Sequence, residues 1–61
     1  MCESSVVLRS PDGERVLMEN VTRIVVDGTT LHLTGIFGER KSIKGRFAEL
    51  DLDGHRLYVE E

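Results

Sequence analysis

The chain has 61 residues and a formal net charge of −3, with 31% charged and 39% hydrophobic residues. This length allows one domain over residues 1–61, because two cores would each bury too little apolar surface to offset the chain entropy. No apolar stretch is long enough to span a membrane and no signal peptide begins the chain, so we expect a cytoplasmic protein.

The first half of the chain predicts four strands, because apolar residues alternate with polar ones and turn signals interrupt them. The expected strands are residues 3–9, 14–19, 21–26 and 29–34. Ser10-Pro11-Asp12-Gly13 predicts a type I turn, since proline presets φ and Gly13 tolerates a positive φ. Asn20 is expected to interrupt the chain between the second and third strands. Asp27-Gly28 predicts a two-residue hairpin turn.

The second half begins with a break at Gly35-Ile36-Phe37-Gly38-Glu39, which we interpret as a turn. Strands are expected over residues 40–44, 46–53 and 55–60, with a bend or bulge at Gly45 and a hairpin turn at Asp53-Gly54. In the strand 46–53, alternation places Ala48, Leu50 and Leu52 opposite Phe47, Glu49, Asp51 and Asp53. The pattern predicts an all-β fold, a small SH3-like or Sm-like barrel of five to seven short antiparallel strands.

No enzyme active site is expected, because so short a chain has little material to build a cleft. The carboxylates of Glu49, Asp51 and Asp53 share one strand face, but polar residues alternating with leucines are typical of a solvated face. Asp51-Leu52-Asp53-Gly54 resembles the start of a calcium loop but lacks its later oxygen ligands.

A basic segment from Arg40 to Arg46, which also includes Lys41 and Lys44, lies near Phe37 and Phe47 in the sequence. Cations beside aromatic rings are typical of RNA-binding surfaces, so a small RNA- or protein-binding module using this edge is the alternative function. Basic residues also protect an exposed edge strand from pairing with other chains. The negative net charge disfavours nucleic acid as a partner.

Cys2 is the residue with the most distinctive chemistry, because it lies beside the terminal amine. The amine of Met1, the amide nitrogen of Cys2 and its thiolate would form two fused five-membered chelate rings. If Met1 is removed, the amine and thiolate of Cys2 close one ring, and the backbone amide of Glu3 is a further ligand. Nitrogen and sulfur ligands in a tetragonal arrangement favour nickel(II) or copper(II). The other interpretation is that Cys2 is a small apolar residue capping the first strand.

His32 and His55 are the two imidazoles, and neither has a Cys or His neighbour at ligand spacing. We interpret them as surface histidines, and as auxiliary metal ligands only if folding or dimerisation brings them near other ligands.

A homodimer is expected on grounds of size. A core this small rarely contributes more than about 3–5 kcal/mol, and one cysteine cannot form an internal disulfide. Two chains with adjacent N-termini would supply two thiolates and two nitrogens, which couples metal binding to dimerisation.

The start Met1-Cys2-Glu3-Ser4-Ser5-Val6-Val7-Leu8, the pair Asp12-Gly13 and the later Gly35-Ile36-Phe37-Gly38-Glu39 resemble the CooT-type small nickel-binding proteins over essentially the full chain. The resemblance implies a small dimeric β-barrel with nickel(II) bound by the second residue, here Cys2. It also implies an accessory role, holding or delivering nickel for the maturation of a nickel enzyme such as carbon monoxide dehydrogenase.

Overall fold

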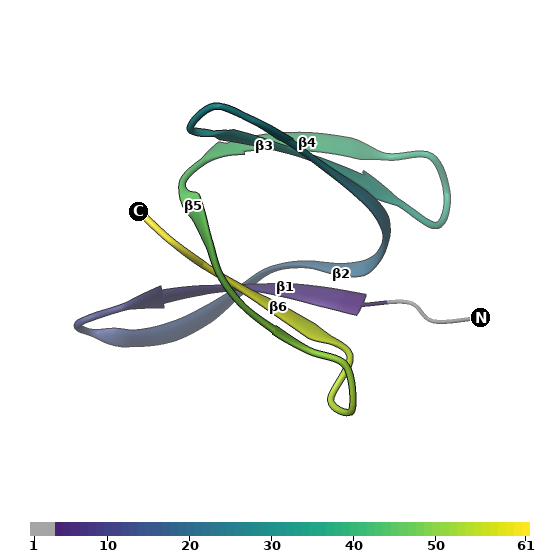
Figure 1. The fold of residues 1–61 in the computed structure, drawn as a ribbon. Coiled ribbons are helices and arrows are strands. Elements are labelled where there is room, and N and C mark those ends of the chain that lie inside the picture. Colours follow the sequence, from purple (N-terminus) through teal and green to yellow (C-terminus); the bar gives the residue numbers. More distant parts are fainter. Residues whose placement is uncertain (1–3) are drawn as a thin grey trace.

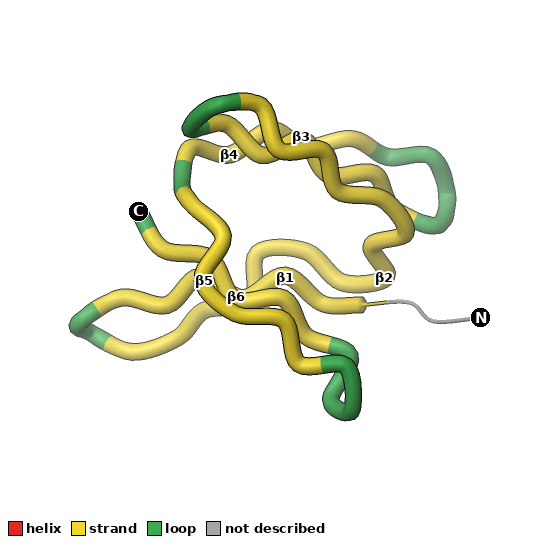
Figure 2. Tube along the Cα trace, viewed as in Figure 1, coloured by secondary structure: helices red, strands yellow, loops and turns green. Residues whose placement is uncertain are grey.

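The computed structural model describes residues 4–61, which form six strands in one sheet and no helix (Figures 1 and 2). The strands are β1 (Ser4–Ser10), β2 (Gly13–Asp27), β3 (Thr30–Gly35), β4 (Arg40–Lys44), β5 (Arg46–Asp51) and β6 (Arg56–Glu60). The predicted all-β fold is confirmed, and six strands lie within the expected number. Nothing in the part of the chain that the structure describes is a helix able to cross a membrane.

The sheet has the strand order β4-β3-β2-β1-β6-β5, so its two edge strands are consecutive in the chain. The sheet must therefore curl until its edges meet at Gly45, the one residue between β4 and β5 (Figure 1). The amide of Gly45 donates to the carbonyl of Thr29 at 2.8 Å, which confirms the predicted bend. No ladder joins β4 to β5 within residues 4–61, so the barrel is open along this seam.

The expectation of antiparallel pairing throughout is wrong for β1 and β6, which run parallel with Val6 opposite Leu57 and Leu8 opposite Val59. These two strands come from opposite ends of the chain. No tight turn connects them, so local geometry does not impose an antiparallel pairing.

The expected strands 14–19 and 21–26 are one continuous strand, β2, of 15 residues. Asn20 bends this strand instead of ending it, with a φ of 56° that asparagine tolerates better than most residues. Before the bend β2 pairs with β1, and from Val21 onward it pairs with β3. One bent strand thus connects the two halves of the curled sheet (Figure 1).

The core lies inside the curl and is built from β-branched and leucine side chains that alternate with polar ones. Its buried members are Val6, Val21, Leu31, Leu33, Leu57 and Val59. Leu31 and Leu33 face inward while Thr30, His32 and Thr34 face outward, as the alternation predicts.

The register of β5 differs from the predicted alternation because of a bulge at Ala48, between Phe47 and Glu49. The extra residue puts Phe47 opposite Val59 and Leu50 opposite Leu57, so both face the inside of the curl. Leu52 lies beyond the strand, in the turn that leads to β6, and is 75% exposed.

Two turns also depart from prediction. Gly28 and Thr29 form the β2–β3 turn, one position later than expected, and Gly28 has a φ of 61°. The β5–β6 turn contains four residues, and its positive φ of 55° falls on His55 rather than on Gly54. An Asp51 carboxylate oxygen accepts a hydrogen bond from the amide of Gly54 at 3.0 Å, which stabilises this longer turn.

Candidate functional site

One end of the barrel, called here the β1 rim, gathers four segments that are distant in the sequence. They are the start of β1 (Ser4 and Ser5), the bend of β2 (Asn20 and Val21), the β3–β4 loop from Gly35, and His55 before β6. Ser4 pairs with Val21, which in turn pairs with Gly35. The amide of Ser5 donates to the carbonyl of His55 at 2.9 Å. Figure 1 shows the start of β1 and the β3–β4 loop at the same end of the molecule.

The predicted metal ligands Met1, Cys2 and Glu3 lie outside the described residues. The chain that carries them leaves from the β1 rim, because Cys2 is two residues before Ser4. From Ser4 to Glu61, no group of three or more His, Asp or Glu side chains is arranged to hold a metal ion.

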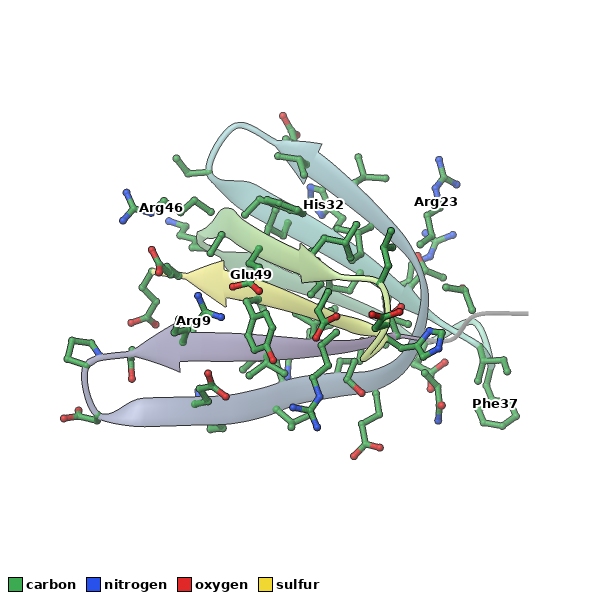
Figure 3. The ribbon with its side chains drawn as sticks, turned by 60° about the horizontal axis from the view of Figure 1, so that its bottom comes forward. Arg9, Arg23, His32, Phe37, Arg46 and Glu49 are labelled. Atoms are coloured by element: carbon green, nitrogen blue, oxygen red, sulfur yellow. The ribbon has the colours of Figure 1, made fainter. Side chains whose placement is uncertain are left out.

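The two histidines have different environments. His55 belongs to the β1 rim through its backbone contact with Ser5, and its side chain is exposed. His32 lies on the outer face of β3, where Nδ1 is 2.9 Å from the Ser42 hydroxyl and Nε2 is 3.9 Å from an Asp27 carboxylate oxygen (Figure 3). The structure thus brings His55, and not His32, next to the strand that follows Cys2. Their roles as auxiliary ligands stay predictions.

The β3–β4 loop contains the turn that the sequence predicts, and its hydrogen bonds are a feature of the rim that the sequence does not predict. Its carbonyls and amides are closely paired: Gly35 receives a hydrogen bond from Gly38 at 3.0 Å and donates to Glu39 at 2.8 Å. A Glu39 carboxylate oxygen accepts from the amide of Phe37 at 2.9 Å, and Ile36 donates to the carbonyl of Asn20 at 2.9 Å. The loop holds Phe37 87% exposed. The sequence signal for this exposed ring is the apolar pair Ile36 and Phe37 between two glycines.

The basic segment is divided by the fold. Arg40 and Lys44 lie on the outer face of β4, whereas Lys41 faces inward and its Nζ is 3.4 Å from the Leu17 carbonyl. Arg46 lies on the opposite edge strand and pairs with Glu60 at 3.2 Å.

A shallow groove of about 450 Å³ crosses the outer face of β2, β3 and β4. Its lining includes Arg23, Val25, His32, Thr34, Arg40 and Ser42. Arg23 and Arg40 both pair with Thr34, from either side, so they flank the strand position directly before the β3–β4 loop.

The carboxylates that share a face in the sequence do not form a site. Glu49 accepts from Arg9 at 3.0 Å, and Arg9 also stacks over the Tyr58 ring at 4.2 Å and lies 3.7 Å from Glu14. The hydrogen bond that Arg9 donates to Glu49 raises the pKa of Arg9, so this guanidinium stays charged. Asp51 is occupied by the turn described above.

Comparisons with known proteins agree with this geometry. The family described as "CO dehydrogenase accessory protein CooT" matches residues 1–60. The chain belongs to the CooT family. This places it among accessory proteins of carbon monoxide dehydrogenase and confirms the resemblance noted in the sequence.

A solved structure supports the assignment to CooT, and two further proteins are similar to the chain. A crystal structure from Carboxydothermus hydrogenoformans, assigned to CooT, is similar with a TM-score of 0.89 and 36% identity, covering 97% of this chain and 95% of that one. An uncharacterized protein of Archaeoglobus fulgidus is 42% identical over 70% of this chain and 96% of its own length. Another, from Methanothermobacter thermautotrophicus, is 37% identical over 98% of this chain and 89% of its own length.

Proposed function

We propose that the chain is a homodimeric nickel(II)-binding accessory protein that holds or delivers nickel during maturation of carbon monoxide dehydrogenase or a related nickel enzyme. The observation that carries the proposal is membership of the CooT family from residue 1, since the matched region includes Cys2. The protein acts as a carrier in the cytoplasm, and no catalytic step is assigned to it.

Cys2 binds the metal as a thiolate, and the nitrogen ligands come from the terminal amine and from the amides of Cys2 or Glu3. This ligand set suits nickel(II), which accepts nitrogen and sulfur donors in a tetragonal arrangement. The lack of a metal-ligating cluster among residues 4–61 supports a site that depends on the N-terminus. His55 is the better auxiliary ligand of the two histidines, because its backbone contacts the start of β1.

The dimer supplies what one chain lacks. A single Cys2 chelate leaves nickel coordinatively incomplete, whereas two chains with adjacent N-termini give two thiolates and two or more nitrogens. The open seam of the barrel supports association as well. Phe47 and Leu50 face the curl beside it and are each about half exposed, at 50% and 49%.

A nickel titration of the wild type, Cys2→Ser and His32→Ala tests the proposal, with the sulfur-to-nickel charge-transfer absorption as readout and sedimentation for oligomeric state. The wild type and His32→Ala are expected to show the band and a dimer, and Cys2→Ser to lose the band. Equal nickel binding by Cys2→Ser and the wild type would overturn the assignment of the thiolate.

A further inference from the structure

The exposed loop Gly35–Glu39 presents a phenyl ring that folding does not use. Phe37 is 87% exposed and Ile36 is 40% exposed, although six of the chain's other apolar residues fill a core. Two adjacent apolar side chains exposed together on one loop are available for a contact with something outside this chain.

The loop is ordered around that ring before any partner arrives. Four hydrogen bonds between 2.8 and 3.0 Å connect the loop to itself and to Asn20. The ends of the Glu39 and Met18 side chains pack closely over the Gly35 backbone, because a Cβ there would meet the Glu39 carboxylate and lie 2.8 Å from the Met18 methyl. A preformed loop loses little conformational entropy on binding, which is the property of an effective anchor.

Two guanidinium groups border this loop without carboxylate partners among the described residues. The four ion pairs found there involve Arg9, His32 and Arg46, and none includes Arg23 or Arg40. Both arginines are exposed, and both flank Thr34 one position before the loop. Figure 3 shows Arg23 and Phe37 projecting at the same end of the molecule, with His32 farther from that end. In a chain of net charge −3, these two cations lie one strand position from an exposed apolar loop, whose own carboxylate, Glu39, accepts a hydrogen bond from the Phe37 amide.

We propose that Ile36, Phe37, Arg23 and Arg40, called here the Phe37 surface, form the docking site for the client enzyme, which offers an apolar pocket bordered by carboxylates. An exposed aromatic side chain next to two arginines fits an apolar pocket bordered by carboxylates, because aromatic and arginine side chains are enriched among the residues that dominate binding at protein interfaces. Ile36 and Phe37 belong to the β1 rim, so docking brings the client to the end of the barrel where β1 begins. This inference rests on the proposed accessory function for the identity of the client, but not on nickel binding.

The test measures binding of immobilised chain to purified, nickel-depleted carbon monoxide dehydrogenase from the same organism. Wild type, Phe37→Ser, Arg23→Glu and Arg40→Glu are compared at low and high salt. Each substitution is expected to weaken binding about tenfold or more, and the two charge reversals to reduce its salt dependence as well.

Matched controls lie on the same strands at the other end of the sheet. Val26→Ser removes an apolar side chain that is 57% exposed, and Lys44→Glu reverses a charge on the same face of β4 as Arg40. Both controls are expected to bind within about twofold of the wild type. Circular dichroism confirms that each variant is folded.

Several outcomes would overturn the docking proposal. The first three are no binding of the enzyme by the wild type, equal losses of enzyme binding in the controls and the test variants, and dissociation of the dimer by Phe37→Ser. The fourth is that the test substitutions weaken binding of a single-stranded RNA oligonucleotide but not binding of the enzyme. Nickel titrations of the same proteins separate the two proposals. Cys2→Ser is expected to dock normally while losing nickel, and docking without nickel binding by the wild type would overturn the carrier function alone.

Discussion

Leu31→Ala removes a side chain that is completely buried at the centre of the sheet. Leu31 is 0% exposed and lies between Val26 on β2 and Ile43 on β4. Substitutions of this kind cost roughly 3–5 kcal/mol, because apolar contacts are lost and the cavity collapses only in part. A core of this size contributes only about 3–5 kcal/mol in total, so the variant is expected to be largely unfolded at 25 °C.

Leu52→Ala provides the matched control, since the same atoms are removed from a side chain that is 75% exposed in the β5–β6 turn. Its stability is expected to stay within about 0.5 kcal/mol of the wild type. Urea unfolding followed by far-ultraviolet circular dichroism gives both values. Protein concentration is held constant, because dimer formation adds to the apparent stability. Similar losses for the two variants would refute the assignment of the core to the inside of the curl.

Three further predictions concern Gly45, His55 and the metal site. Gly45→Ala is expected to destabilise the fold by about 1–3 kcal/mol, because a Cβ would lie 2.8 Å from the Glu60 carbonyl oxygen. Gly54→Ala is the control and should cost less in the same urea assay, because its Cβ meets only a movable Asp51 carboxylate. A larger loss for Gly54→Ala than for Gly45→Ala would contradict the close approach of Gly45 to Glu60. His55→Gly should raise the free energy of unfolding by up to about 1 kcal/mol, because glycine adopts the φ of 55° found here without strain. His55→Ala should give no such gain, since alanine keeps a Cβ. Equal gains for the two variants would exclude the backbone as the cause. Nickel affinity should fall by at least about tenfold for each pH unit below the ordinary thiol pKa of about 8.5, because binding requires the thiolate and a deprotonated amine. Titrations between about pH 6 and 8 check this, and a flat profile would exclude Cys2 as a ligand.

The strands follow from local chemistry that the sequence shows directly. Alternation of apolar and polar residues predicts which side chains of β3 and β6 face inward, because side chains in any strand point to opposite faces in turn. The turn at Pro11 and Asp12 is equally local, since proline presets its own φ. The proposed role of Cys2 as a metal ligand is likewise a prediction from sequence, because a thiolate beside a terminal amine can close a chelate ring.

Other features arise only when distant segments meet. The parallel pairing of β1 with β6, the bend of β2 at Asn20 and the bulge at Ala48 each adjust the sheet so that β4 and β5 can meet at Gly45. No single segment carries the signal for such an adjustment, because it depends on how six strands share one curled core. The same curl brings His55 and the loop of Phe37 beside the start of β1. The sequence by itself therefore determined the strands and the candidate metal ligand, whereas only the tertiary structure decided which residues surround that end of the chain.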